Sequence, residues 1–107
     1  MKYRLRSDLS KTAVYMIVKQ FAPTGIVLPP LRKCEFKKYR GTYWLRFYFD
    51  GRRFKAVFDG CLGRAYVSYE LDPLYGEDDS LAYDFCRQVV TLPWDYLLNN
   101  NLLREVA

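Results

Sequence analysis

The side chains that could do chemistry are concentrated in one basic and aromatic stretch, TYWLRFYFDGRRFKAVFDG, residues 42–60. Trp44, Arg46 and Tyr48 alternate with apolar residues, and this period of two predicts that they share one face of a strand. Aromatic rings can stack on nucleic-acid bases while Arg and Lys bind the phosphates between them. The pattern therefore predicts a sheet face that binds single-stranded RNA or DNA, or a nucleoprotein complex.

The predicted binding surface combines basic and aromatic side chains, with no metal site and no cofactor beside them. Its members are Lys37, Lys38, Arg40, Trp44, Arg46, Tyr48, Arg53 and Lys55. Two structural interpretations stay open. Tyr48 could stack on Arg53 on an ordinary solvent face, or another helix could bury the aromatic rings while the Arg and Lys stems extend to solvent.

Residues that are absent or isolated exclude many enzyme classes. The chain has no histidine, so it cannot carry a Ser-His-Asp or Cys-His arrangement or a Cys₂His₂ zinc site. Cys34, Cys61 and Cys86 are odd in number and form no CxxC pair, which predicts reduced thiols in a cytoplasmic protein. The longest apolar run, 13–18, is far too short to cross a membrane. We expect a non-enzymatic domain without a membrane partner.

Charge is distributed unevenly along the 107 residues. Residues 1–64 hold fifteen Lys or Arg and four acids, a net charge of +11, whereas residues 65–107 hold two and eight, a net charge of −6. A basic half of this density is typical of proteins that bind polyanions. The alternative is that the two halves neutralise each other across the fold.

A hairpin is expected to position the predicted surface. Asp50-Gly51 is a strong signal for a two-residue turn, and the register that follows places Arg46 opposite Lys55. It also directs Leu45, Phe47, Phe54, Ala56 and Phe58 into the core. Like charges on opposite strands destabilise a sheet by up to about 1 kcal/mol. The pair therefore predicts a bridging anion, unless Glu70 on the next strand neutralises it.

The remaining elements follow from periodicity. A helix is expected over 10–21, with Leu9, Ala13, Met16, Ile17 and Phe21 at helical spacing, Ser7, Asp8 or Ser10 as its cap, and a strand as the alternative. A third strand over 65–71 would point Ala65, Val67, Tyr69 and Leu71 inward and Tyr66, Ser68 and Glu70 outward. Leu81, Phe85, Val89 and Leu92 predict a helix capped by Asp78, Asp79 and Ser80, and Pro93 begins another.

Together these elements predict a single α+β domain over 1–107. It would consist of an N-terminal helix, a three- to four-stranded antiparallel sheet with a central β-hairpin at about 43–58, and C-terminal helices packed on one sheet face.

The run KKYRGTYWLRFYFDGRRFKAVF resembles the central hairpin of the RelE/HigB-type toxins. Lys38, Gly41, Tyr43, Leu45 and Arg46 match the first half of the family pattern, Asp50-Gly51 supplies the turn, and Phe54 with Lys55 stands at the aromatic-Arg pair. Upstream, GIVLPP is similar to the Gly-x-x-Leu-x-x-Pro approach of some members, so the resemblance covers residues 25–58. It implies a ribosome-dependent messenger-RNA endonuclease in which Arg46 stabilises phosphate charge and Lys37 and Lys38 bind the RNA backbone.

Three functions are therefore expected from the sequence, in order of preference. The first is a non-enzymatic nucleic-acid or nucleoprotein-binding domain. The second is the toxin, although its basic C-terminal segment is replaced here by the acidic YVSYELDPLYGEDD. The third is a small inhibitor of the kind that phages and mobile elements carry, anti-CRISPR proteins among them, which would bind a large protein complex.

Overall fold

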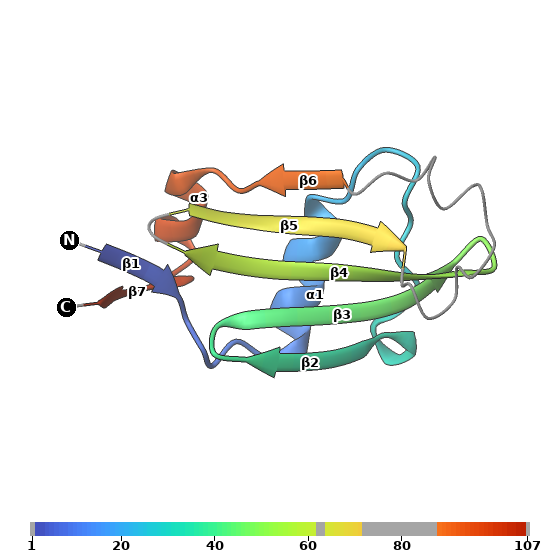
Figure 1. The fold of residues 1–107 in the computed structure, drawn as a ribbon, viewed down its shortest axis with the longest axis horizontal. Coiled ribbons are helices and arrows are strands. Elements are labelled where there is room, and N and C mark those ends of the chain that lie inside the picture. Colours follow the sequence, from blue (N-terminus) through green and yellow to red (C-terminus); the bar gives the residue numbers. More distant parts are fainter. Residues whose placement is uncertain (1, 62–63, 72–87, 107) are drawn as a thin grey trace.

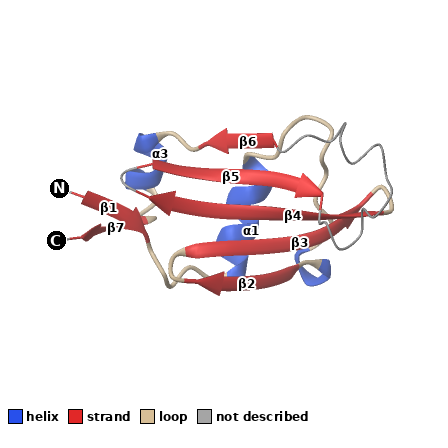
Figure 2. Cartoon of the chain, in the orientation of Figure 1, coloured by secondary structure: helices blue, strands red, loops and turns tan. Residues whose placement is uncertain are grey.

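The computed structural model describes residues 2–61, 64–71 and 88–106. In chain order its elements are β1 (Lys2–Leu5), α1 (Lys11–Gln20), the 3-10 helix η1 (Leu31–Lys33), β2 (Glu35–Tyr39), β3 (Thr42–Phe49), β4 (Arg52–Cys61), β5 (Arg64–Leu71), β6 (Gln88–Thr91), α3 (Trp94–Asn99) and β7 (Leu103–Val106). Five strands form one antiparallel sheet in the order β2-β3-β4-β5-β6, and β1 pairs with β7 separately (Figures 1 and 2). Helix α1 lies behind the main sheet in this view.

The predicted fold class is wrong. The chain begins with a strand rather than a helix, the main sheet has five strands rather than three or four, and a second, two-stranded sheet joins the chain ends. Among the helices in the described residues, only α1 is longer than six residues. Instead of C-terminal helices covering a sheet face, the part after residue 87 contains two strands and the six-residue α3.

The helix predicted from Leu81 to Leu92 is contradicted where it can be compared. Residues 88–91 form β6, in which Val89 pairs with Ser68 and Val90 with Val67 of β5. Two adjacent β-branched residues favour a strand, and the pairing with β5 outweighs the apolar spacing that also fits a helix. The rest of that prediction, with its cap at Asp78, Asp79 and Ser80, lies outside the described residues. The helix after Pro93 is present as α3.

Helix α1 forms where periodicity predicts it, and the strand alternative is wrong. Ser10 is the cap, because its Oγ accepts a hydrogen bond from the Ala13 N–H at 3.2 Å. The buried face consists of Val14, Tyr15, Ile17 and Val18. Met16, which was expected on that face, is 57% exposed. The helix packs on the sheet, and the Tyr69 hydroxyl of β5 donates to the Val18 carbonyl at 2.7 Å.

The predicted central hairpin is confirmed. Asp50 and Gly51 both have positive φ, 54° and 72°, as a type I′ turn requires, and Arg46 lies opposite Lys55. Of the residues expected in the core from this hairpin and from β5, Leu71 is only partly buried. The others are buried: Leu45, Phe47, Phe54, Ala56, Phe58, Ala65, Val67 and Tyr69. They face α1, so one layer of side chains between helix and sheet forms the core.

The two-stranded sheet packs against one end of the main sheet. Leu5 of β1 is buried on Gly60 of β4, where a Cβ would meet the leucine side chain. The Arg6 N–H donates to the Leu102 carbonyl at 2.9 Å and extends the β1–β7 pairing. The buried Tyr43 hydroxyl donates to the Arg6 carbonyl and accepts from the Leu9 N–H. These contacts hold β1 and β7 at the end of the main sheet where the β2–β3 turn lies (Figure 1).

Candidate functional site

The face of the main sheet that points away from α1, called the distal face below, collects most of the predicted surface. Its members from the prediction are Lys37, Trp44, Arg46, Tyr48, Arg53 and Lys55. Strand pairing sets Lys37 beside Trp44, Arg46 beside Lys55, and Tyr48 beside Arg53. This face is turned toward the viewer in Figure 1.

Two predicted residues do not belong to the distal face. Lys38 pairs with the core residue Tyr43 and so lies on the α1 side of β2, where its charge helps to lower the pKa of Asp8. Arg40 is in the β2–β3 turn with φ 48°, and its guanidinium lies 5.3 Å from the centre of the Tyr39 ring. The alternation of side chains along β2 separates these two cations from the others.

Acidic side chains interrupt the basic surface. One row across four strands reads Glu35, Arg46, Lys55 and Glu70. Lys55 Nζ lies 3.2 Å from Glu70 Oε1, and both side chains are mostly buried, at 20% and 27% exposed. A guanidinium nitrogen of Arg53 lies 3.0 Å from Glu35 Oε2. The row therefore contains two acids for its two central cations.

This row answers the question raised by the like-charged pair. Arg46 and Lys55 do face each other, as the turn predicts, but Glu70 pairs with Lys55 and Glu35 lies opposite Arg46. The Nε atom of Arg46 is buried. The neutralising role considered for Glu70 is thus the one that the structure shows, and the pair does not by itself call for an anion from solution.

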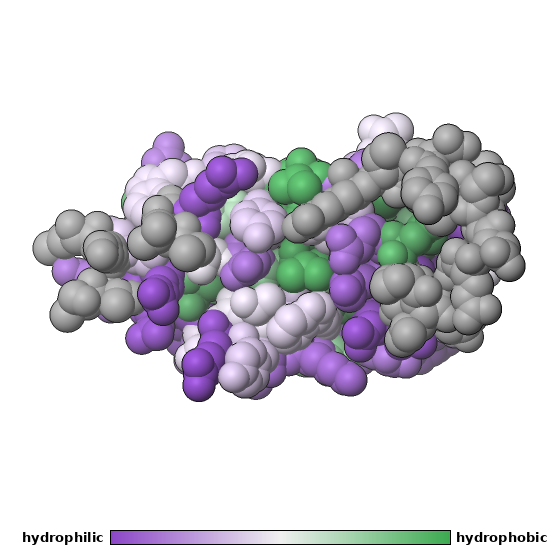
Figure 3. Space-filling view, in the orientation of Figure 1, coloured by the Kyte–Doolittle hydropathy of each residue, from purple (hydrophilic) through white to green (hydrophobic). Residues whose placement is uncertain are grey.

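The centre of the distal face is more apolar than expected. Strand pairing places Val57, Ser68 and Val89 side by side there. Ser68, expected to point to solvent, does lie on the distal face but is fully buried. Figure 3 shows hydrophobic residues in the middle of this face and hydrophilic residues on either side of them.

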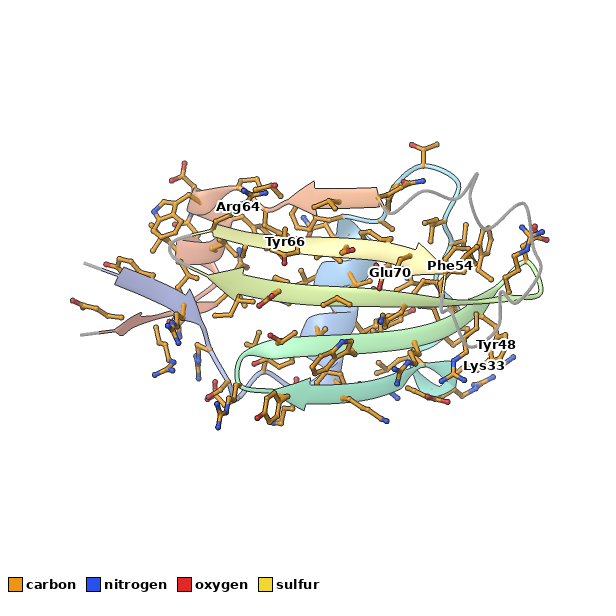
Figure 4. All side chains as sticks on the ribbon, in the orientation of Figure 1. Lys33, Tyr48, Phe54, Arg64, Tyr66 and Glu70 are labelled. Atoms are coloured by element: carbon orange, nitrogen blue, oxygen red, sulfur yellow. The ribbon has the colours of Figure 1, made fainter. Side chains whose placement is uncertain are left out.

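Aromatic residues lie toward both ends of the distal face, as Figure 4 shows for Tyr48 and Tyr66. Tyr48 is 50% exposed near the β3–β4 turn. At the other end the Arg64 guanidinium lies 5.9 Å from the centre of the Tyr66 ring. Each tyrosine is next to a cation, Tyr48 beside Arg53 and Tyr66 beside Arg64, so both ends offer the combination of ring and positive charge that nucleic acid requires.

A second group of cations, called the arginine pocket below, surrounds a cavity of about 510 Å³ where β1 and β7 meet the β2–β3 turn. Arg4, Arg40 and Arg104 line it together with Ser7 and Asp59. Arg4 and Arg104 lie directly opposite each other on β1 and β7. In the described part of the chain neither forms an ion pair with an acid.

The acid in the arginine pocket is already engaged by its own strands. Asp59 Oδ1 accepts hydrogen bonds from the Gly60 N–H at 2.8 Å and from Thr42 Oγ1 at 3.1 Å. The Tyr66 hydroxyl donates to Asp59 Oδ2 at 3.4 Å. These bonds fix the carboxylate toward β3, β4 and β5. Three guanidinium groups and one carboxylate leave the lining with a net positive charge.

Placing two arginines opposite each other costs stability, up to about 1 kcal/mol for a like-charged cross-strand pair. Arg40 adds a backbone cost, because a side chain other than Asn or Asp rarely adopts positive φ. Gly41 follows at φ 81°, so Arg40-Gly41 is a second two-residue turn of the Asp50-Gly51 kind. Folding alone therefore does not explain why arginine occupies these positions.

Sequence reasoning included Arg40 but missed Arg4 and Arg104. Arg4 and Arg104 come together only because the two ends of the chain pair, and no local sequence pattern predicts that pairing. The one available signal was the alternation of apolar and basic residues in YRLR, residues 3–6, which fits a short strand.

The described residues contain neither a reactive cysteine environment nor a membrane-spanning helix. Cys34 is a free, buried thiol, and burial raises its pKa, which leaves less of the reactive thiolate at neutral pH. No described helix combines the length and the apolar character needed to cross a membrane.

Comparisons with protein-family models, with curated proteins and with solved structures find no match to this chain.

Proposed function

We propose that this protein is a non-enzymatic domain that binds nucleic acid, preferably single-stranded, or a nucleoprotein complex, through its distal face. The observation that carries the proposal is the strand register, which brings Lys37, Trp44 and Tyr48 onto one face with Arg53. Rings and cations then alternate along neighbouring strands, as stacking on bases and binding of phosphates require.

The ion pairs of the distal face define where a strand would bind. Since Glu35 and Glu70 neutralise the central row, we place the phosphate contacts at Lys37, which is exposed, rather than at Arg46 and Lys55. The half-exposed Tyr48 ring offers a stacking surface on the same face, four residues along β3 from Trp44, which pairs with Lys37.

Lys37 and Lys38 provide a matched test. They are adjacent in β2, both exposed, and lie on opposite faces of the sheet. We expect Lys37→Gln to weaken binding of a fluorescent ten-nucleotide RNA or DNA in an anisotropy titration by several-fold, and Lys38→Gln to leave it almost unchanged. Affinity should also fall steeply between two salt concentrations, because phosphate contacts release counterions.

Equal effects of the two substitutions would contradict the distal face as the binding surface. Failure of the wild type to bind either oligonucleotide at low salt would overturn the proposal altogether. In that case a pull-down that recovers one large complex would favour the inhibitor, and growth arrest on expression that Arg46→Ala relieves would favour the endonuclease.

A further inference from the structure

We propose that the arginine pocket is a binding site for a phosphate monoester, either a free nucleotide or the 5′ end of a phosphorylated strand. This site is separate from the central row of the distal face, and the proposal does not require that the distal face binds nucleic acid.

The first support is charge that the fold leaves without compensation. Arg4 and Arg104 face each other across β1 and β7 with no acid paired to either among the described residues. The neighbouring Arg6 shows the contrast, since Asp8 binds it at 2.7 and 2.9 Å. A multivalent anion between Arg4 and Arg104 would turn their repulsion into two attractive contacts.

The second support is the chemistry of the donors. A guanidinium presents N–H groups in a planar fork that matches phosphate oxygens, and such charge-assisted bonds are about twice as strong as neutral ones. Arg40 adds a third fork from the β2–β3 turn, with the Tyr39 ring beside it, and Ser7 adds a hydroxyl. Three forks suit a doubly charged phosphate better than a single carboxylate, which carries one charge.

The third support is size. Pockets for small ligands enclose about 300–1,000 Å³, and this cavity of about 510 Å³ is in that range. A bare phosphate ion would leave most of it empty. We therefore infer an ester whose organic part occupies the remaining space, and a nucleotide has the required size.

The test uses adenosine 5′-monophosphate as the probe and the thermal unfolding of the full chain as the readout. The nucleotide should raise the melting temperature in a concentration-dependent way, because a ligand that binds only the folded state stabilises it. Adenosine should not, and sodium chloride at equal ionic strength should do so much less, since it only screens the repulsion between the arginines. If the nucleotide stabilises the protein no more than the salt does, the proposal is overturned.

Two variants and a control identify the site. Arg4→Gln should lose most of the nucleotide-induced shift, whereas Arg32→Gln, which removes an exposed arginine from η1, should retain it. Arg40→Asn is a second pocket variant that should fold normally, because asparagine is favoured at positive φ. This variant should unfold at a higher temperature than the wild type without ligand, yet respond less to the nucleotide. A full response in both pocket variants would refute the assignment.

Two oligonucleotides separate the sources of the phosphate. If a ten-nucleotide RNA with a 5′-phosphate binds several-fold more tightly than the same RNA with a 5′-hydroxyl, and Arg4→Gln removes the difference, the ligand is a strand end. If only the free nucleotide responds to Arg4→Gln, the ligand is a nucleotide. Lys37→Gln should leave the response to adenosine 5′-monophosphate unchanged, so the two proposals can fail separately.

Discussion

The distal face and the arginine pocket both gather cations from several strands, but they differ in how those cations are neutralised. On the distal face Lys55 has Glu70 at 3.2 Å and Arg53 has Glu35 at 3.0 Å. In the arginine pocket Arg4 lies opposite Arg104, and the carboxylate of Asp59 is hydrogen-bonded to the main sheet instead.

The difference shows that basic residues in a sequence are poor guides until their partners are known. Arg46 and Lys55 attract attention in the sequence because they alternate with aromatic residues, yet on the same sheet Glu70 pairs with Lys55 and Glu35 lies opposite Arg46. Arg4 and Arg104 have no distinctive context in the sequence, and their net charge emerges only when the chain ends pair. Within this comparison the pocket has the greater need for an external anion.

The largest expected effects concern the contact between Leu5 and Gly60 at the wall of the pocket. In Gly60→Ala the new Cβ would clash with Leu5 and lie 2.9 Å from its Cδ1, and overpacking of this kind costs about 1–3 kcal/mol. We expect that loss in the free energy of unfolding, measured with urea, together with loss of the nucleotide response.

Leu5→Ala is the matched background for this substitution. Alone it should cost about 2–5 kcal/mol, because it removes a buried leucine side chain. It also makes room for the alanine at position 60. The double variant should therefore be more stable than the sum of the two single effects implies. Strict additivity would mean that the Leu5–Gly60 contact does not fix β1 on the main sheet.

A smaller effect is expected when an acid is introduced into the arginine pocket, as Glu70 already stands beside Lys55 on the distal face. Arg104→Glu converts the pair with Arg4 from like to opposite charge and should stabilise the fold by about 0.2–1 kcal/mol. The gain should shrink at high salt, which screens exposed charges, and the response to adenosine 5′-monophosphate should disappear. Arg104→Gln is the control, with about half the gain. A less stable Arg104→Glu variant would contradict the like-charge repulsion.

The smallest effect concerns Arg6, the cation directly after β1, which has its own acid in Asp8. Hydrogen bonds from Arg6 hold the pKa of Asp8 below its usual 3.8. Because the pKa in the folded state is depressed, the pair stabilises the fold above the unfolded pKa, and this contribution is lost as the pH falls through the folded pKa. A titration of the Asp8 carboxyl by NMR should show its pKa rising toward the usual value in Arg6→Gln. An unchanged value would show that the ion pair does not form in solution.

Local sequence signals correctly predicted the central hairpin and helix α1. The dipeptide Asp50-Gly51 specifies a turn, the turn specifies the register, and the register specifies which side chains face α1. Ser10 and the apolar spacing after it were sufficient for α1. The six cations and rings of the distal face follow from this hairpin and from the alternation along β2.

The parts that sequence missed depend on pairing between distant segments. Strand β1 has four residues and pairs with a strand about a hundred positions later, so the short alternation in YRLR could not identify that partner. Strand β6 belongs to a segment whose apolar spacing also fits a helix, although its two adjacent valines favour the strand that pairs with β5. The β2–β3 turn has Arg40 at a position where Asn, Asp or Gly would have been a recognisable turn signal. The arginine pocket depends on the pairing of β1 with β7 and on the β2–β3 turn, so the sequence did not predict it.

The position of β2 has a consequence for how copies of this protein meet. As the outermost strand on its side of the sheet, it presents on one flank backbone N–H and C=O groups that β3 does not use, and such an edge can template aggregation. A second β2 arriving antiparallel would bring Lys37 and Lys38 close to the same two lysines, one pair on each face. Repulsion on both faces disfavours edge-to-edge addition, so these lysines protect solubility whatever the domain binds.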